Sequence, residues 1–156
     1  MFNAREQPLI DRDTDQVRID KYVTMHDSGK LLNPLLAEGQ IYGAFAWAVG
    51  CALYEEFSYG EDGSFLTGTF ADYLVPTACE IPEPVILHFE SPSLFTPLGA
   101  KGIGEGNCMS TPVCIANAVC DALRPFKAEL NSTPIRWGDV AAYFGDDPFA
   151  SAGDER

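Results

Sequence analysis

The sequence predicts an α+β fold. Residues 17–25 alternate apolar and polar side chains and include β-branched members, which is the pattern of a strand. Residues 34–57 form a long apolar stretch and 111–123 a shorter one, and each has a proline in its first turn, which is typical of helices. These segments do not alternate as strand–helix–strand units, so a mixture of helices and short sheets is expected.

Length and composition indicate one globular domain. The chain has 156 residues, of which 46% are hydrophobic and 21% charged, enough to bury a core. We expect three parts along it. An irregular N-terminal arm covers 1–16, which is polar and lacks periodicity, a folded unit covers 17–145, and an acidic tail covers 146–156.

Charge and cysteine content exclude several classes of function. The formal net charge is −13, so the chain repels phosphate backbones and no nucleic-acid partner is expected. The longest apolar run, residues 41–54, is too short to cross a membrane, and no membrane partner is expected. The chain opens without a signal peptide and has five cysteines, an odd number. This favours reduced thiols and a cytoplasmic location.

The first predicted helix begins at Asn33 and Pro34, with the asparagine as a capping acceptor and the proline in the first turn. It is expected to run to about Phe57. Because the helix is apolar nearly all round, protein should enclose it on most sides. Trp47, inside it, is expected to pack in the core.

The remaining elements follow from turn residues and periodicity. Residues 59–63 are expected to form a turn that leads into a short strand over 64–70. A second strand is expected within 85–90. Thr111-Pro112 should start the second helix, again with a hydroxyl cap. A last amphipathic segment covers 139–144.

The glycine-rich stretch over 99–106 is the most informative local feature. It holds four glycines in eight residues and one acid, Glu105, just before a predicted helix. Such a loop allows close approach of a bulky group, although an exposed turn with a solvated glutamate has the same pattern. The spacing fits neither a Walker loop nor the dinucleotide fingerprint. The cysteines lack metal-site spacing, and His26 and His88 stand alone, so they predict no metal centre.

Three motifs in order resemble one family. They are N-P-x4-G-Q at 33–40, D-Y-x-x-P-T at 72–77 and G-A-K-G-x-G-E at 99–105. Together they resemble the C-terminal part of the large subunit of molybdenum hydroxylases, the family of xanthine oxidase, aldehyde oxidase and aerobic carbon monoxide dehydrogenase. The resemblance extends over about residues 17–145, which would then be a molybdopterin-binding subdomain.

The resemblance implies a specific role for Glu105. In that family the glutamate of this loop is the general base that deprotonates a Mo–OH group, whose oxygen attacks an electron-poor carbon while hydride passes to a sulfido ligand. The residues implied to contact molybdopterin are Gly43, Ala44, Trp47, Lys101, Gly102, Ile103 and Gly104. None of these is implied to ligate the metal directly.

The resemblance also implies partners and leaves alternatives open. The remainder of the large subunit, which shares the molybdenum–molybdopterin cofactor, is expected as a partner. Separate subunits are expected to carry 2Fe-2S clusters and FAD, and the substrate is a small molecule. The chain would act only within such a complex. Trp47-Ala48 stands where many relatives have a glutamine–glycine pair, which suggests a reshaped pocket. A non-catalytic remnant or assembly module that binds no molybdenum is the alternative, and an unrelated acidic binding protein is a third.

Overall fold

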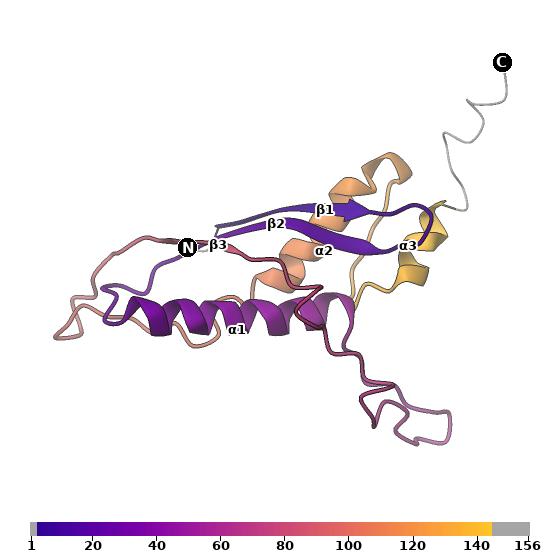
Figure 1. Ribbon diagram of the computed structural model, residues 1–156, viewed down its shortest axis with the longest axis horizontal. Coiled ribbons are helices and arrows are strands. Elements are labelled where there is room, and N and C mark those ends of the chain that lie inside the picture. Colours follow the sequence, from indigo (N-terminus) through magenta and orange to yellow (C-terminus); the bar gives the residue numbers. More distant parts are fainter. Residues whose placement is uncertain (1–2, 145–156) are drawn as a thin grey trace, which may run out of the picture.

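A three-stranded mixed sheet with helices against it makes up the fold, as Figure 1 shows. The computed structural model describes residues 3–144, so the acidic tail expected over 146–156 lies outside the described residues. The strand order is β1-β2-β3, with β1 antiparallel and β3 parallel to the central strand. The strands are β1 (Asn3–Ile10), β2 (Val17–His26) and β3 (Val85–His88). The helices are α1 (Pro34–Leu53), α2 (Thr111–Ala122) and α3 (Trp137–Phe144), with a 3-10 turn η1 (Arg124–Phe126) before the last.

The fold class predicted from the sequence is therefore confirmed, and so are the strands over 17–25 and within 85–90. The irregular N-terminal arm is wrong, because residues 3–10 form β1 and pair along β2. The pairing rests on backbone hydrogen bonds, which a polar sequence can make without apolar alternation. The pairing is also irregular at one point, because the register shifts between Gln7 and Pro8.

Helix α1 begins as predicted and ends earlier than predicted. The Asn33 side chain accepts a hydrogen bond from the Leu36 amide, as an N-cap should. The helix stops at Leu53 rather than near Phe57. The Gly50 carbonyl accepts from the amides of both Tyr54 (2.9 Å) and Glu55 (2.8 Å), which closes the last turn and turns the chain away.

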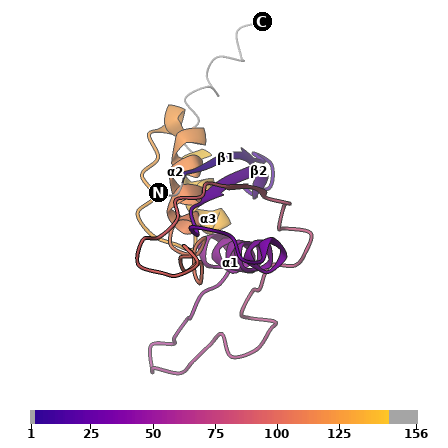
Figure 2. The same cartoon turned by 90° about the vertical axis from the view of Figure 1, so that its left-hand side faces the viewer.

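The helices and the sheet enclose a single apolar cluster. Tyr22 from β2 stacks on Phe45 from α1 with ring centroids 4.2 Å apart. Figure 2 shows α1 running under the sheet with α2 beside it. The cluster also contains Val17, Val49, Ala52, Leu53, Ile115, Val119, Leu123, Ile135 and Val140. Within residues 3–144, no helix is both long enough and apolar enough to cross a membrane.

Other local predictions need correction. Residues 64–70 form no named strand, and only an isolated bridge joins Tyr59 to Phe65. The hydroxyl cap of α2 is also wrong. Ser110, in the cap position, makes no cap hydrogen bond, and the Thr111 hydroxyl lies 2.7 Å from the Tyr22 hydroxyl instead. A buried phenol thus takes the hydroxyl that the helix end would otherwise use.

One long connection was also missed at the level of topology. β2 and β3 are parallel, and α1 lies between them in sequence, followed by residues 54–84. This is a crossover between parallel strands. The sequence did not predict this crossover, because its non-helical segment carries turn residues and prolines instead of continuing the helix.

Candidate functional site

Backbone pairing holds the start of the glycine-rich loop against the residues that directly follow β2. Gly29 and Ala100 form an antiparallel bridge. The Lys30 amide donates to the Gly99 carbonyl (3.0 Å), and the Lys101 amide donates to the Ser28 carbonyl (2.7 Å). Gly29 has φ +63°, and a Cβ there would collide with the Gly99 carbonyl oxygen, so the pairing requires glycine at this position.

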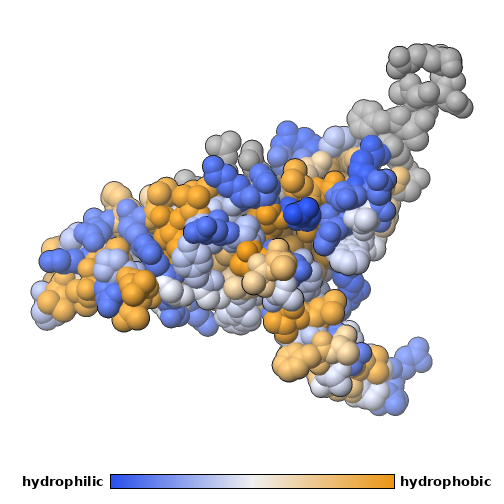
Figure 3. All heavy atoms as spheres, viewed as in Figure 1, coloured by the Kyte–Doolittle hydropathy of each residue, from blue (hydrophilic) through white to orange (hydrophobic). Residues whose placement is uncertain are grey.

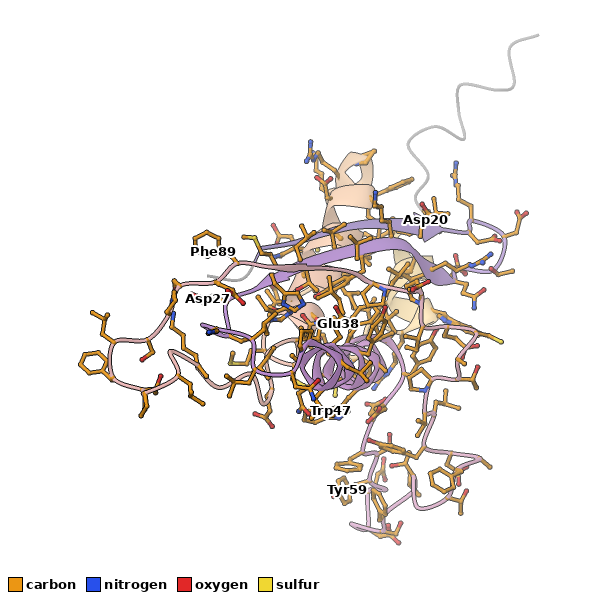
Figure 4. All side chains as sticks on the ribbon, turned by 60° about the vertical axis from the view of Figure 1, so that its left-hand side comes forward. Asp20, Asp27, Glu38, Trp47, Tyr59 and Phe89 are labelled. Atoms are coloured by element: carbon orange, nitrogen blue, oxygen red, sulfur yellow. The ribbon has the colours of Figure 1, made fainter. Side chains whose placement is uncertain are left out.

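A cluster of three polar side chains locks the same pairing. The Lys101 ammonium donates to Asp27 Oδ2 (2.9 Å) and to Ser91 Oγ (2.6 Å), and the Ser91 hydroxyl also donates to Asp27. The hydrogen bond from Ser91, followed by that from Lys101, holds the pKa of Asp27 well below its usual range. Figure 4 shows Asp27 at this end of the sheet. The Lys101 side chain, expected to contact a cofactor, is thus engaged in holding the frame.

A buried polar network lies directly beneath the loop. Asn107, which is fully buried, accepts hydrogen bonds from the hydroxyls of Thr24 (3.0 Å) and Tyr22 (3.4 Å). The Thr24 oxygen lies 3.0 Å from His26 Nε2. Because the Thr24 proton goes to Asn107, the imidazole must be the donor in this contact, which places its proton on Nε2. The network therefore ties the end of the loop to the middle of the sheet.

His26 is part of the floor of the site. It is 1% exposed, and its pKa is lowered by burial first, against a hydrogen bond with Asn107 that raises it; the nearby His88 lowers it further. A Cβ at Gly106 would lie 3.2 Å from its Nδ1, so the loop backbone rests almost on the ring. A neutral imidazole is therefore the form that this packing favours.

Glu105 is at the crest of the loop. It is exposed, and within residues 3–144 no hydrogen bond or ion pair engages its carboxylate. Its carbonyl accepts from the Cys108 amide (3.0 Å), and burial, then the charge of Glu105, raise the pKa of the Cys108 thiol. Among the described residues, nothing lies within 4 Å of the Cβ positions of Gly102 and Gly104. The backbone on the near side of Glu105 is therefore open to a large group.

Two hollows flank the loop. One, of about 300 Å³, lies between the end of β2 and residues 102–106 and includes His26, Glu105 and Met109 in its wall. The other, of about 420 Å³, lies between the loop and the first turns of α1. Ser28 lines both. Ser28 is 6% exposed, and among the described residues its hydroxyl has no hydrogen-bond partner. A buried hydroxyl in the wall of two hollows is therefore available to a ligand.

Helix α1 forms a third side of the site. Gln40 Nε2 donates to the Gly104 carbonyl (2.6 Å), which brings this face of the helix against the loop. Gly43 and Trp47 follow Gln40 by one and two turns and are both exposed. Trp47 is 51% exposed and projects from the side of α1 that faces away from the sheet (Figure 4), so its predicted place in the core is wrong.

The expected enclosure of α1 is also incomplete in this chain. Leu35 is 78% exposed and Leu36 70%, on the same half of the helix as the site. Ala44, in contrast, is 7% exposed, and its carbonyl accepts from the Cys108 thiol (3.6 Å). The structure thus brings Gly102, Ile103, Gly104 and Glu105 together with the Gly43 face of α1. It turns the Ala44 side chain toward the core instead.

Sequence reasoning missed the floor of the site. Tyr22, Thr24 and His26 occupy alternate positions of β2 and face inward, and this spacing was visible in the sequence. Asn107 follows the glycine-rich loop directly, but a single asparagine after a turn has no distinctive pattern. Among residues 3–144, no three His, Cys, Asp or Glu side chains gather as a metal site.

Comparison with known proteins gives consistent matches. The sequence profile of the molybdopterin cofactor-binding domain matches residues 9–82. The nicotine 6-hydroxylase large subunit of Paenarthrobacter nicotinovorans is 38% identical over 137 residues, which are 86% of this chain and 17% of that one. The carbon monoxide dehydrogenase large chain of Afipia carboxidovorans is 36% identical over 113 residues, 72% of this chain and 14% of that one.

A solved structure gives the same result. The crystal structure of quinoline 2-oxidoreductase from Pseudomonas putida 86 superimposes with a TM-score of 0.85 at 36% identity, over 89% of this chain and 18% of that one. The chain therefore spans less than a fifth of the length of each of these relatives.

Proposed function

Because this chain belongs to the molybdenum hydroxylase large-subunit family and has the fold of its molybdopterin-binding domain, we propose that it supplies one wall of a molybdopterin site and that Glu105 is the general base there. The observation that carries the proposal is the position of Glu105. Its carboxylate stands unengaged at the crest of a loop whose two ends are held by the Lys101 cluster and the Asn107 network.

The residues around the loop fit a large polar group such as a pterin. Ser28 offers a buried hydroxyl that needs a partner, and it faces both hollows. The missing side chains of Gly102 and Gly104 leave the backbone open on the side of Glu105. Gly43 leaves a corresponding gap on α1, because nothing among the described residues lies within 4 Å of its Cβ position.

The proposed part that Glu105 plays is to accept a proton at a carboxylate oxygen. When bound, the molybdenum–molybdopterin group would supply the two-electron oxidation of the substrate. Further protein over this face would exclude water, and because burial disfavours a charged carboxylate, Glu105 would become a stronger base. The hydrogen bond from Gln40 to Gly104 keeps the loop from moving while the proton is taken.

Residues 3–144 enclose no complete pocket around the loop, and the relatives are much longer than this chain. We therefore infer that the rest of the large subunit closes the site, whether in the same polypeptide or as a separate one. Subunits with 2Fe-2S clusters and FAD would carry electrons away. The relatives are named for hydroxylation or oxidation of nicotine, quinoline and carbon monoxide, so a small, electron-poor substrate is the class that we propose.

The test is Glu105→Gln in the assembled complex. We expect molybdenum content to be unchanged and turnover to fall by roughly 10²–10⁴-fold, the range for loss of a general base. Glu129→Gln, at a glutamate that is also exposed but far along the chain, is the matched control and should retain full turnover. Normal activity of the Glu105 variant would refute the assignment.

A non-catalytic assembly module of the same fold is a second candidate. The observation in its favour is Trp47, whose exposed indole lies on α1 where the resemblance places a glutamine. Molybdenum and pterin analysis of the native complex separates the two. Stoichiometric molybdenum supports the enzyme subunit, and a complex without molybdenum supports the module.

A further inference from the structure

Residues 54–84 form an arm that leaves the body of the molecule. The arm begins where α1 ends and returns at β3. Figure 1 shows it projecting below the C-terminal end of α1, on the opposite side from the sheet, and Figure 2 shows the same separation. Its tip therefore contributes little to the apolar cluster under the sheet.

The arm carries an aromatic cluster that stays exposed. Phe57 stacks on Tyr73 (centroids 5.5 Å apart) and meets Phe65 edge-on (5.7 Å), and Tyr59 packs on Phe65 (5.4 Å). Nevertheless Phe57 is 66% exposed and Phe70 is 89% exposed. A hollow of about 560 Å³ opens between these rings. Figure 3 shows apolar residues beside polar ones on the surface of the arm, and Figure 4 shows Tyr59 near its tip.

The arm keeps its shape by contacts of its own. The Leu66 amide donates to the Ser58 carbonyl (2.9 Å), and the Tyr73 hydroxyl donates to Glu55 Oε2 (2.5 Å). At the base, the Arg136 guanidinium pairs with Glu56. An exposed aromatic surface on a shape that is already set is typical of a docking surface, because little ordering entropy remains to be lost on binding.

The charge of the arm restricts what can cover it. Residues 54–84 contain no lysine or arginine and the following acids: Glu55, Glu56, Glu61, Asp62, Asp72, Glu80 and Glu83. The whole chain has a net charge of −13. A second copy would bring like charge against like charge, which disfavours self-association through this surface. The complementary surface is apolar at its centre and basic at its rim.

We propose that the arm docks onto the part of the large subunit that this chain does not span, at an apolar surface rimmed by Lys and Arg. The proposal rests on the proposed function, because it takes its occupant from the large subunit. More than four-fifths of such a subunit lies outside this chain, since the chain covers 17% of the nicotine 6-hydroxylase large subunit. That leaves ample protein to cover the rings.

The first experiment is a cross-link from the arm in the native assembly. p-Benzoylphenylalanine replaces Phe70, whose exposure makes the substitution tolerable, and the complex is irradiated and mapped by mass spectrometry. We expect a cross-link to a large-subunit peptide outside the present 156 residues, with Lys or Arg nearby. A cross-link to a second copy, or to an iron–sulfur or flavin subunit, would overturn the proposal.

The second experiment measures cover by chymotrypsin digestion of the same assembly. Cleavage at Tyr59, Phe65 and Tyr73, the arm sites that both proteins keep, should be roughly tenfold or more faster in the Phe57→Ser/Phe70→Ser variant than in the wild type, because loss of the central rings opens the contact. Val113→Ser, which removes an exposed apolar side chain from α2, is the matched control and should leave the rate unchanged. Equal rates in the arm variant and the wild type would overturn the proposal.

Failure of the arm and failure of the proposed function give different results. Molybdenum in the complex and an inactive Glu105→Gln variant, without a large-subunit cross-link, would refute the arm alone. A large-subunit cross-link in a complex that lacks molybdenum would support the arm and refute the enzymatic role.

Discussion

Removal of the Asn107 side chain is the most direct test of how the site is held. Asn107 is fully buried, and its Oδ1 accepts from the hydroxyls of Thr24 (3.0 Å) and Tyr22 (3.4 Å). The Tyr22 hydroxyl keeps a second contact with Thr111 (2.7 Å), so the main loss in Asn107→Ala falls on Thr24. The Asn107 Nδ2 also donates a long hydrogen bond to the Ile41 carbonyl (3.5 Å). We therefore expect one good hydrogen bond and two long ones to disappear and a buried hydroxyl to lose its acceptor.

The expected loss of unfolding free energy is about 3 kcal/mol. A hydrogen bond contributes about 1 kcal/mol net, and a buried donor left without an acceptor costs roughly 1–3 kcal/mol, to which the space left by the amide adds. Urea denaturation followed by circular dichroism measures the difference. Asn131→Ala, at an exposed position, is the matched control and should change stability by less than about 0.5 kcal/mol.

A double-mutant cycle separates the hydrogen bond from the loss of volume. Thr24→Val keeps the shape of the side chain and removes its hydroxyl. If the two side chains interact as the geometry indicates, the combined variant loses about 1 kcal/mol less than the sum of the single losses. Strict additivity, or an Asn107→Ala loss under about 1 kcal/mol, would show that the network does not hold the loop.

Two further predictions concern the frame of the loop. Gly106→Ala should lower stability by about 1–2 kcal/mol, because its Cβ would lie 3.2 Å from His26 Nδ1. Gly104→Ala, with nothing among the described residues within 4 Å, should have little effect, and urea midpoints compare the two. The depressed pKa of Asp27 means that this carboxylate stabilises the fold above the ordinary aspartate pKa of about 3.9 and that the contribution is lost as pH falls. Lys101→Met should make the loss of stability below about pH 5 shallower, measured by urea midpoints across pH, and an unchanged slope would contradict the role of the cluster.

The sequence predicted the elements whose residues act locally. The Asn33 cap and the alternation over 17–25 depend on neighbours within a few residues, and both appear as expected. The end of α1 was misplaced because it is set by the Gly50 carbonyl, which accepts two amides, while the apolar pattern continues past it. β1 was missed because backbone pairing with β2 imposes no side-chain pattern of its own.

The same difference between local and long-range interactions applies to the candidate site. The loop over 99–106 was identifiable from its glycines, whose conformational freedom is a property of the residue. The position of the Lys101 side chain could not be predicted, because its ammonium donates to Asp27 and Ser91, which are distant in sequence. Trp47 was assigned to the core because an apolar helix normally buries its aromatic residues. Within residues 3–144, no other segment covers the side of α1 that carries Trp47, and the indole is exposed.

The position of Glu105 and its proposed role as a base therefore depend on different parts of the protein. Its position is determined inside this chain, by the pairing of residues 28–30 with 99–101 and by the network around Asn107. The general-base role that we propose for it also requires water exclusion, which the exposed position of Glu105 in this loop does not provide here. If the arm is what secures the missing cover, then loss of the arm's rings should reduce turnover while the loop itself stays folded. The Asn107→Ala variant should instead destabilise the loop itself while it leaves the docking surface of the arm unchanged.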